Sequence, residues 1–266
     1  MDGVTARDLS LAPPPPWPPA NPRRRRVLIA VAVAWGLLLA ATGLWYSFHG
    51  RPTAREQTTI AQAQPTVDQA IENVVRAAGS AVVPAVFGYE KVADCDVTPI
   101  RRGSTYARVA WFYTPVGSEP ALLDRIVAGL PAGYDANATH SEGGALHTLT
   151  ADAGNFVAVR GTVAASGLVE IKATTGCRTL GHQPAADPSA PPGTNPLGVT
   201  GTWRLHTLPC GLRTLSVTGP VGKPLSTLPR ADAVVSTAEL YADRTGLAVR
   251  TEADVATLTT TSGTCR

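Results

Sequence analysis

The chain is poor in the residues from which most catalytic and metal centres are built. Its 266 residues include 4 cysteines, 5 histidines and 1 methionine. No C-x-x-C pair occurs, which argues against a structural zinc site. The patterns G-x-S-x-G, G-x-x-x-x-G-K-[ST] and G-x-G-x-x-G are also absent. The sequence therefore predicts neither a nucleophile elbow nor a phosphate-binding glycine loop, and we expect no cofactor.

Lysine is scarce as well, and the charges are unevenly distributed. Residues 1–26 carry five arginines against two aspartates, whereas residues 49–266 carry 18 basic and 18 acidic side chains. The larger region is therefore neutral, which argues against nucleic acid as a partner. The basic excess belongs to the first 26 residues and suits the anionic lipid of an inner leaflet.

One long apolar segment is present, between Val27 and Tyr46, and it contains no charged side chain in 20 residues. A helix of that length is roughly 30 Å long, which is the thickness of the hydrocarbon layer of a bilayer. Four arginines, Arg23 to Arg26, precede it, and Trp45 ends it beside Tyr46. This order predicts a single transmembrane helix over residues 27–48 in the plasma membrane, with residues 1–26 as a cytoplasmic tail.

A cleaved secretory signal is the alternative for such a segment. A signal has a short basic start, an apolar run of about 7 to 15 residues and small residues at the cleavage site. Here the lead is longer, and the segment ends in the bulky sequence "LWYSFHGR". We therefore expect an uncleaved signal anchor that places residues 49–266 outside the cytoplasm.

The tail is rich in proline at "APPPPWPPANP", residues 12–22. Proline fixes φ and lacks an N–H, so this stretch favours an extended polyproline conformation. A solvated spacer is the expected role, and a docking strip for an aromatic groove is the alternative. With its Ala, Thr, Pro and Gly bias, the chain resembles uncharacterised single-pass membrane proteins of high-GC Gram-positive bacteria, a resemblance of composition that implies no activity.

Beyond a polar stalk at residues 49–65, periodicity predicts an α+β ectodomain. A helix is expected from a capping box at Thr66 and Gln69 to Gly79, with apolar residues at a spacing of 3.6. A second helix is expected in "SEPALLDRIVAGLP", residues 118–131. Alternating segments predict antiparallel strands with one solvated face, at residues 104–116, 155–163 and 168–174. The expected fold is antiparallel sheet with a helix on one face: module 1 at 66–180, a linker at 181–202 and a smaller β-rich module 2 at 203–266.

The two modules share six landmarks in one order, which suggests an internal repeat. They are a cysteine (Cys95, Cys210), Pro-Val-Gly (115–117, 220–222), Leu-Pro (130–131, 228–229), Ala-Asp (151–152, 242–243), Ala-Val-Arg (158–160, 248–250) and Cys-Arg (177–178, 265–266). The hypothesis is a duplication whose second copy has lost most of its helix. Coincidence is the alternative, because each landmark alone is common.

The cysteines are expected to form disulfides, because an extracytoplasmic compartment is oxidising. Three pairings are open to four cysteines. If each module closes on itself, the bonds are Cys95 to Cys177 and Cys210 to Cys265. The second bond would also hold the end of the smaller module.

Few side chains remain as candidates for chemistry. His140, Glu142 and His147 flank a predicted Gly143-Gly144 turn and could hold a divalent metal, although solvent-facing polar residues are the expected reading and no metal is predicted. If the chain is a hydrolase, Asp152 joins these three as a residue to mutate. Asp94 and Asp96 are expected to be exposed on either side of a buried Cys95, because alternate residues of a strand face opposite ways.

These observations favour a non-catalytic binding or scaffolding module of the cell envelope, held by lipid and serving an envelope protein partner. An envelope hydrolase with an unrecognised site and a transmembrane sensor that signals through the Pro-rich tail are the alternatives. The oligomeric state is not predicted.

Overall fold

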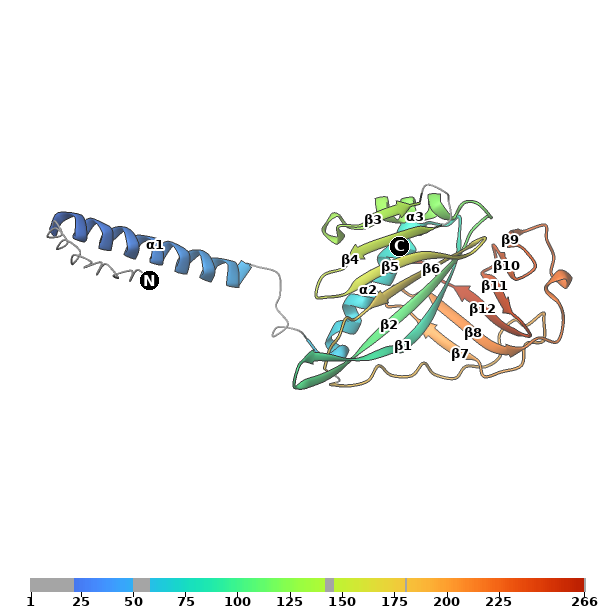
Figure 1. Cartoon of the computed structure of the whole chain (residues 1–266). Coiled ribbons are helices and arrows are strands. Elements are labelled where there is room, and N and C mark those ends of the chain that lie inside the picture. The colour runs from blue at the N-terminus through green and yellow to red at the C-terminus, as the bar shows by residue number, and fades with distance from the viewer. Residues whose placement is uncertain (1–21, 50–57, 142–145, 180, 266) are drawn as a thin grey trace, which may run out of the picture. The chain divides into compact units, whose positions relative to one another are not determined.

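The computed structural model describes residues 22–49, 58–141, 146–179 and 181–265. The chain divides into two compact units, Met1–Arg51 and Pro52–Arg266, and the second unit holds both sheets (Figure 1). The Pro-rich stretch at residues 12–22 lies outside the described residues except for Pro22.

Helix α1 (Pro22–His49) forms where the long apolar segment predicted it. It is long and apolar enough to cross a membrane. Its side chains are exposed from Pro22 to Tyr46, as expected for a helix that lipid rather than protein solvates.

The second unit contains two antiparallel sheets of six strands each. The first has the order β1-β2-β6-β5-β4-β3. Its strands are β1 (Val83–Thr98), β2 (Arg101–Tyr113), β3 (Asn137–His140), β4 (His147–Asp152), β5 (Ala158–Ala165) and β6 (Leu168–Thr174). The second has the order β7-β8-β12-β11-β10-β9. Its strands are β7 (Arg204–Thr207), β8 (Arg213–Pro220), β9 (Ala233–Ser236), β10 (Leu240–Asp243), β11 (Leu247–Glu252) and β12 (Val255–Ser262).

The strand order is the same in both sheets when each is numbered from its own first strand. Helical structure separates the second and third strands in each case: α3 (Glu119–Gly129) with the short η1 (Ala132–Tyr134), and the single turn η2 (Leu225–Thr227). The shared landmarks occupy matching places. Leu130 and Leu228 are the buried C-caps of α3 and η2, and Ala-Asp ends the fourth strand of both sheets.

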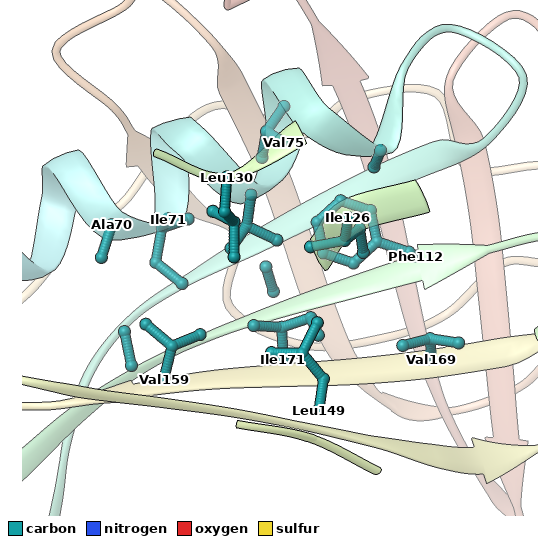
Figure 2. Close-up of a cluster of buried hydrophobic side chains, with 14 of the residues drawn as sticks. Ala70, Ile71, Val75, Phe112, Ile126, Leu130, Leu149, Val159, Val169 and Ile171 are labelled. Carbon is teal, nitrogen blue, oxygen red and sulfur yellow. The ribbon is translucent and has the colours of Figure 1, made fainter. Parts of the chain in front are cut away.

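Helix α2 (Ile60–Ala78) and α3 pack together on one face of the first sheet. In Figure 2 their apolar side chains lie above Ile171, in the same buried cluster as Phe112, and Ile171 and Phe112 are both fully buried. Each such side chain contributes about 1.5 to 3 kcal/mol relative to an exposed one. The prediction of an antiparallel sheet with a helix on one face is confirmed, and α2 packs on the same face as α3.

The predicted start of α2 was wrong, because the helix begins at Ile60 with Thr59 as its N-cap. The Thr59 N–H donates to Gln62 Oε1 at 3.0 Å, which makes the capping contact expected at Thr66. Ile60 and Ala63 are buried and extend the apolar stripe of the helix through Pro65. Residues 60–65 therefore belong to the helix rather than to a stalk.

The second sheet covers the other face of β1, β2 and β6. Ala85 and Tyr113 of the first sheet pack with Leu240 and Ala248 of the second in one buried cluster. The outer face of the second sheet is covered by the connection between the sheets, residues 181–202, in which Leu197 is fully buried. The two predicted modules therefore form one compact unit, and Leu197 and Val199 of the predicted linker belong to its core.

Candidate functional site

A groove opens where the end of α2 meets one end of the second sheet. Its volume is about 730 Å³, within the ordinary range for small-ligand sites. Three segments distant in sequence form its walls: residues 75–84 around the α2–β1 connection, the β10–β11 turn at 244–246, and residues 261–265 at the end of β12. The groove therefore forms only in the folded domain, and no short sequence motif predicts it.

The charged side chains in the wall of the groove are both arginines. Arg76 lies in the last turn of α2 and Arg244 in the β10–β11 turn, and no aspartate, glutamate or lysine lines the groove among the described residues. One Arg76 nitrogen donates to Asn73 Oδ1 at 2.8 Å. Arg244 makes no hydrogen bond or ion pair to another described residue. The groove is therefore electropositive.

The turn that carries Arg244 is held by the buried carboxylate of Asp243. Asp243 Oδ1 accepts from the Thr245 N–H at 2.9 Å and from the Thr245 hydroxyl at 2.6 Å. Gly246 has φ +92°, and a Cβ there would meet the carbonyl oxygen of Thr261. Asp243 is thus engaged inside the turn and forms no ion pair with the arginine beside it.

Tyr241 contacts the same carboxylate of Asp243. Its hydroxyl lies 3.2 Å from Asp243 Oδ2. Burial and the nearby charge of Asp243 raise the pKa of Tyr241 to about 12. The hydroxyl therefore stays protonated at neutral pH.

The third wall is fixed by the Cys210–Cys265 disulfide. The bond ties the residues after β12 to the β7–β8 turn, and the Cys210 N–H donates to Glu72 Oε1 of α2 at 2.6 Å. Gly263 has φ +83°, and a Cβ there would press on the carbonyl of Gly211. These contacts hold α2, the β7–β8 turn and the residues after β12 in fixed positions around the groove.

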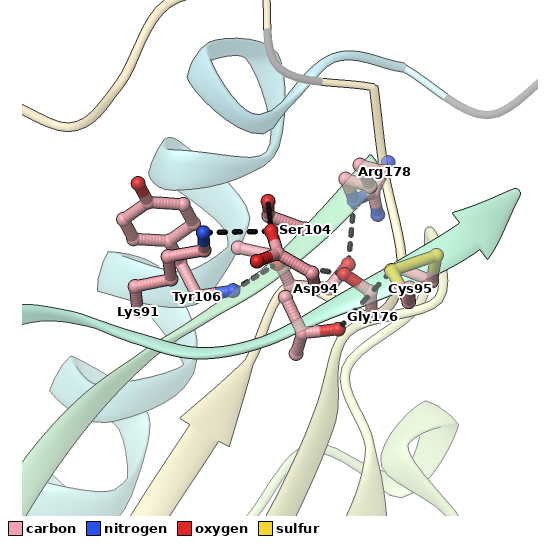
Figure 3. Close-up of a disulfide and its surroundings, with 10 residues drawn as sticks. Lys91, Asp94, Cys95, Ser104, Tyr106, Gly176 and Arg178 are labelled. Carbon is pink, nitrogen blue, oxygen red and sulfur yellow. Dashed lines mark hydrogen bonds and ion pairs between the residues drawn. A yellow bond between two sulfur atoms is a disulfide. The ribbon is translucent and has the colours of Figure 1, made fainter. Parts of the chain in front are cut away.

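The other disulfide joins Cys95 and Cys177, so both bonds follow the pairing within each module. Figure 3 shows Asp94 beside it, accepting from the Ser104 hydroxyl at 2.8 Å and paired with Lys91 at 2.6 Å. The hydrogen bonds from Lys91 and Ser104 lower the pKa of Asp94. Asp94 and Asp96 are exposed and Cys95 is half-buried, a surface ion-pair arrangement rather than a pair of catalytic carboxylates.

Arg178 anchors the start of the domain next to this disulfide. It is 1% exposed, and its guanidinium donates to the Thr175 carbonyl at 2.5 Å and to the Thr58 hydroxyl at 2.7 Å. Its backbone pairs with Ser104 of β2 in an isolated bridge. The arginine therefore connects the chain entering α2 with the chain leaving β6.

Sequence reasoning missed a serine, a histidine and an aspartate that the fold brings together. His206 Nε2 lies 2.7 Å from Ser216 Oγ, and His206 Nδ1 lies 3.0 Å from Asp187 Oδ2. The three come from β7, β8 and the connection between the sheets. A Cβ on Gly88 of β1 would collide with Asp187, so that glycine leaves the space the carboxylate occupies.

The distances resemble those of a hydrolytic triad, but the surroundings do not support nucleophilic catalysis. His206 and Ser216 are 5% and 7% exposed, and the His206 Nδ1 contact lacks hydrogen-bond alignment. β8 is paired on both sides at Ser216, with β7 and with β12, so the strand offers no free N–H groups for an oxyanion. We interpret these contacts as structural, because they hold the connecting segment against β7 and β8.

The candidates around the β3–β4 hairpin divide into two places. His140 and His147 are cross-strand partners, their Nδ1 atoms are 2.8 Å apart, and Asp124 Oδ1 lies 3.0 Å from His140 Nε2. Glu142 lies outside the described residues. Asp152 sits at the other end of β4, where it accepts from the Gly154 N–H at 2.9 Å. No group of three side chains converges as metal ligands in the described part of the chain.

A buried charged network links the layers, and no short-range sequence pattern indicates it. Arg108 of β2 is 4% exposed and pairs with Asp68 of α2. The Tyr89 hydroxyl donates to the same Asp68 oxygen at 2.6 Å. Burial, with the charge of Asp68, raises the pKa of Tyr89. The network is structural, because its groups bond one another and the backbone.

The comparisons with known proteins assign no relative. No family model matches the chain, and no curated protein or solved structure matches it.

Proposed function

We propose that the protein is a single-pass membrane protein of the cell envelope, anchored by an uncleaved α1 with its N-terminus in the cytoplasm. Its sheet domain lies outside and acts as a binding or scaffolding module without catalysis. One observation carries this proposal: among the described residues, one helix able to cross a membrane precedes a domain in which all four cysteines are disulfide-bonded.

Charge and redox chemistry support the proposed orientation. Arg23 to Arg26 immediately precede the apolar segment, and such clusters stay on the cytoplasmic side. Disulfides persist in oxidising compartments and are rare in the cytosol. The arginine cluster and the disulfides both support a domain on the side opposite the arginines.

We further infer that the two sheets derive from duplication of one module. The identical strand order, the matching disulfides and the landmark residues at equivalent places support it. The second copy keeps only the turn η2 where the first has α3, and it covers its core with the connecting segment instead.

The non-catalytic role is supported by the chemistry of the candidate sites. The Ser216 arrangement is closed to substrate, and the polar side chains that line the groove among the described residues carry guanidinium and hydroxyl groups with no acid or base pair. Such groups bind and orient ligands but do not by themselves transfer protons at neutral pH.

Topology reporters test the proposal on the full chain. A phosphatase that is active only outside the cytoplasm is fused to the C-terminus in one strain and to the N-terminus in another. We expect activity from the C-terminal fusion alone, retention of the full-length chain in carbonate-washed membranes, and no titratable thiol. An active N-terminal fusion, or a soluble product that lacks residues 1–48, would contradict the proposal.

A further inference from the structure

We propose that the groove between α2 and the second sheet binds the free carboxylate end of a short peptide. This inference deepens the proposed binding function and rests on it. The ligand class follows from the charge, the lining and the rigidity of the groove.

The charge of the groove selects an anion. Arg76 and Arg244 bring two permanent positive charges, and no carboxylate among the described residues shares the groove with them. Because Arg244 has no partner among the described residues, its planar fork is free to bind a carboxylate through two parallel hydrogen bonds.

The lining selects a ligand that is more than a bare anion. Buried apolar side chains form the floor, including Val75, Val82 and Leu212. Exposed hydroxyls of Ser80, Thr245, Ser262 and Thr264 stand along the walls. A groove of this kind suits a chain with small apolar side groups and regularly spaced polar groups, which describes a short peptide.

Backbone groups add to this complementarity. Gly263 and Thr264 follow the last strand and make no backbone hydrogen bond to another described residue. A peptide lying along this segment would satisfy them through its own N–H and C=O groups. A free phosphate ion could accept from the N–H groups, but it would leave the C=O groups and the apolar floor without a partner.

The walls are arranged before any ligand arrives. Asp243 holds the turn that carries Arg244, and the Cys210–Cys265 bond holds the opposite wall against Glu72 of α2. Preorganised groups lose little conformational freedom on binding, so a small ligand can be bound specifically.

The test uses the full chain in detergent micelles and two fluorescein-labelled probes, Ala-Ala-Ala with a free C-terminal carboxylate and the same peptide as a C-terminal amide. Fluorescence anisotropy gives the dissociation constant for each probe. Arg244→Gln is the principal variant and Arg76→Gln the second. Arg160→Gln on β5 is the matched control, because Arg160 is exposed and does not line the groove.

We expect the carboxylate probe to bind at least about tenfold more tightly than the amide probe. Arg244→Gln should weaken carboxylate binding about tenfold or more, which corresponds to a charge-assisted hydrogen bond, while Arg160→Gln should leave it unchanged. Equal binding of the two probes would overturn the inference, as would equal effects of Arg244→Gln and Arg160→Gln. Binding of inorganic phosphate without binding of either peptide would also overturn it. So would the absence of peptide binding, and none of these outcomes would move the topology reporters.

Discussion

A guanidinium nitrogen of Arg108 lies 2.5 Å from a carboxylate oxygen of Asp68, and this pair joins strand β2 to helix α2 in the interior of the domain. The same guanidinium donates to the backbone carbonyls of Phe87, at 3.0 Å, and Thr207, at 2.6 Å. One side chain thus connects the helix layer, the first sheet and the start of the β7–β8 turn.

Replacing Arg108 should be severely destabilising. Arg108→Met leaves the Asp68 carboxylate without its counter-charge and two carbonyls without their donor, so we expect a loss of about 3 kcal/mol or more in the free energy of unfolding. Urea unfolding followed by circular dichroism measures it. Arg160→Met, at an exposed position, is the control and should cost under about 0.5 kcal/mol.

A double variant separates the charge from the packing. In Arg108→Met with Asp68→Leu no buried charge is left unpaired, so the combined loss should be smaller than the sum of the two single losses. Strict additivity would show that Asp68 and Arg108 act independently.

The two disulfides should differ in what they control. Their sequence separations of 82 and 55 residues correspond to about 4 kcal/mol each in the chain-entropy description. Removing Cys210 and Cys265 as a pair of alanines should also free a wall of the groove, whereas removing Cys95 and Cys177 should not. Unfolding and peptide anisotropy, measured on both double variants, check this. A groove that binds equally well without the Cys210–Cys265 bond would refute the positioning role.

Tyr113 gives a prediction of the opposite sign. Its side chain is fully buried and its hydroxyl has no hydrogen-bond partner among the described residues. Tyr113→Phe removes an unsatisfied polar group, so the free energy of unfolding should stay the same or rise by about 1 kcal/mol. A loss of more than about 1 kcal/mol, by the same urea measurement, would contradict this reading.

Tyr113 also contributes to the dependence of the free energy of unfolding on alkaline pH. Burial raises the pKa of Tyr113 and of Tyr89 well above the ordinary tyrosine value, and that of Tyr241 to about 12. Between about pH 10 and 12 the unfolded chain loses these protons while the folded chain keeps them, so stability is present below pH 10 and falls as pH rises. In Tyr113→Phe the fall should be shallower by about 1.4 kcal/mol per pH unit. An unchanged slope would exclude Tyr113 as a contributor.

The predictable parts of the structure are those determined by short-range pattern. The alternation in β5 and β6, the stripe and Ser118 start of α3, and the uncharged run of α1 each lie within one segment. Sequence order left three cysteine pairings open, and the structure has the one expected if each module closes on itself. The start of α2 was missed because the burial of Ile60 depends on packing against the folded domain, which outweighed Pro65.

The groove and the His206 contacts depend on long-range geometry. Arg76 and Arg244 are brought to one groove only when α2 and the β10–β11 turn are both in place. Asp187 reaches His206 because the connecting segment runs along β7, with the Leu205 N–H donating to the Pro188 carbonyl at 3.0 Å. Because the sequence predicts only a linker at residues 181–202, it does not predict that Asp187 lies beside His206.

The last prediction distinguishes a structural role of Ser216 and His206 from a hydrolytic one. Since Ser216 and His206 are almost fully buried and no free N–H groups await an oxyanion, a fluorophosphonate probe should not label the folded chain. His206→Ala should lower the free energy of unfolding by about 1 to 3 kcal/mol, because it leaves Asp187 and the Ser216 hydroxyl without their shared partner. Mass spectrometry of the probe-treated chain checks the first point and urea unfolding the second. Stoichiometric labelling of Ser216 that disappears in His206→Ala would instead identify an open, activated nucleophile and would make the envelope hydrolase the better description.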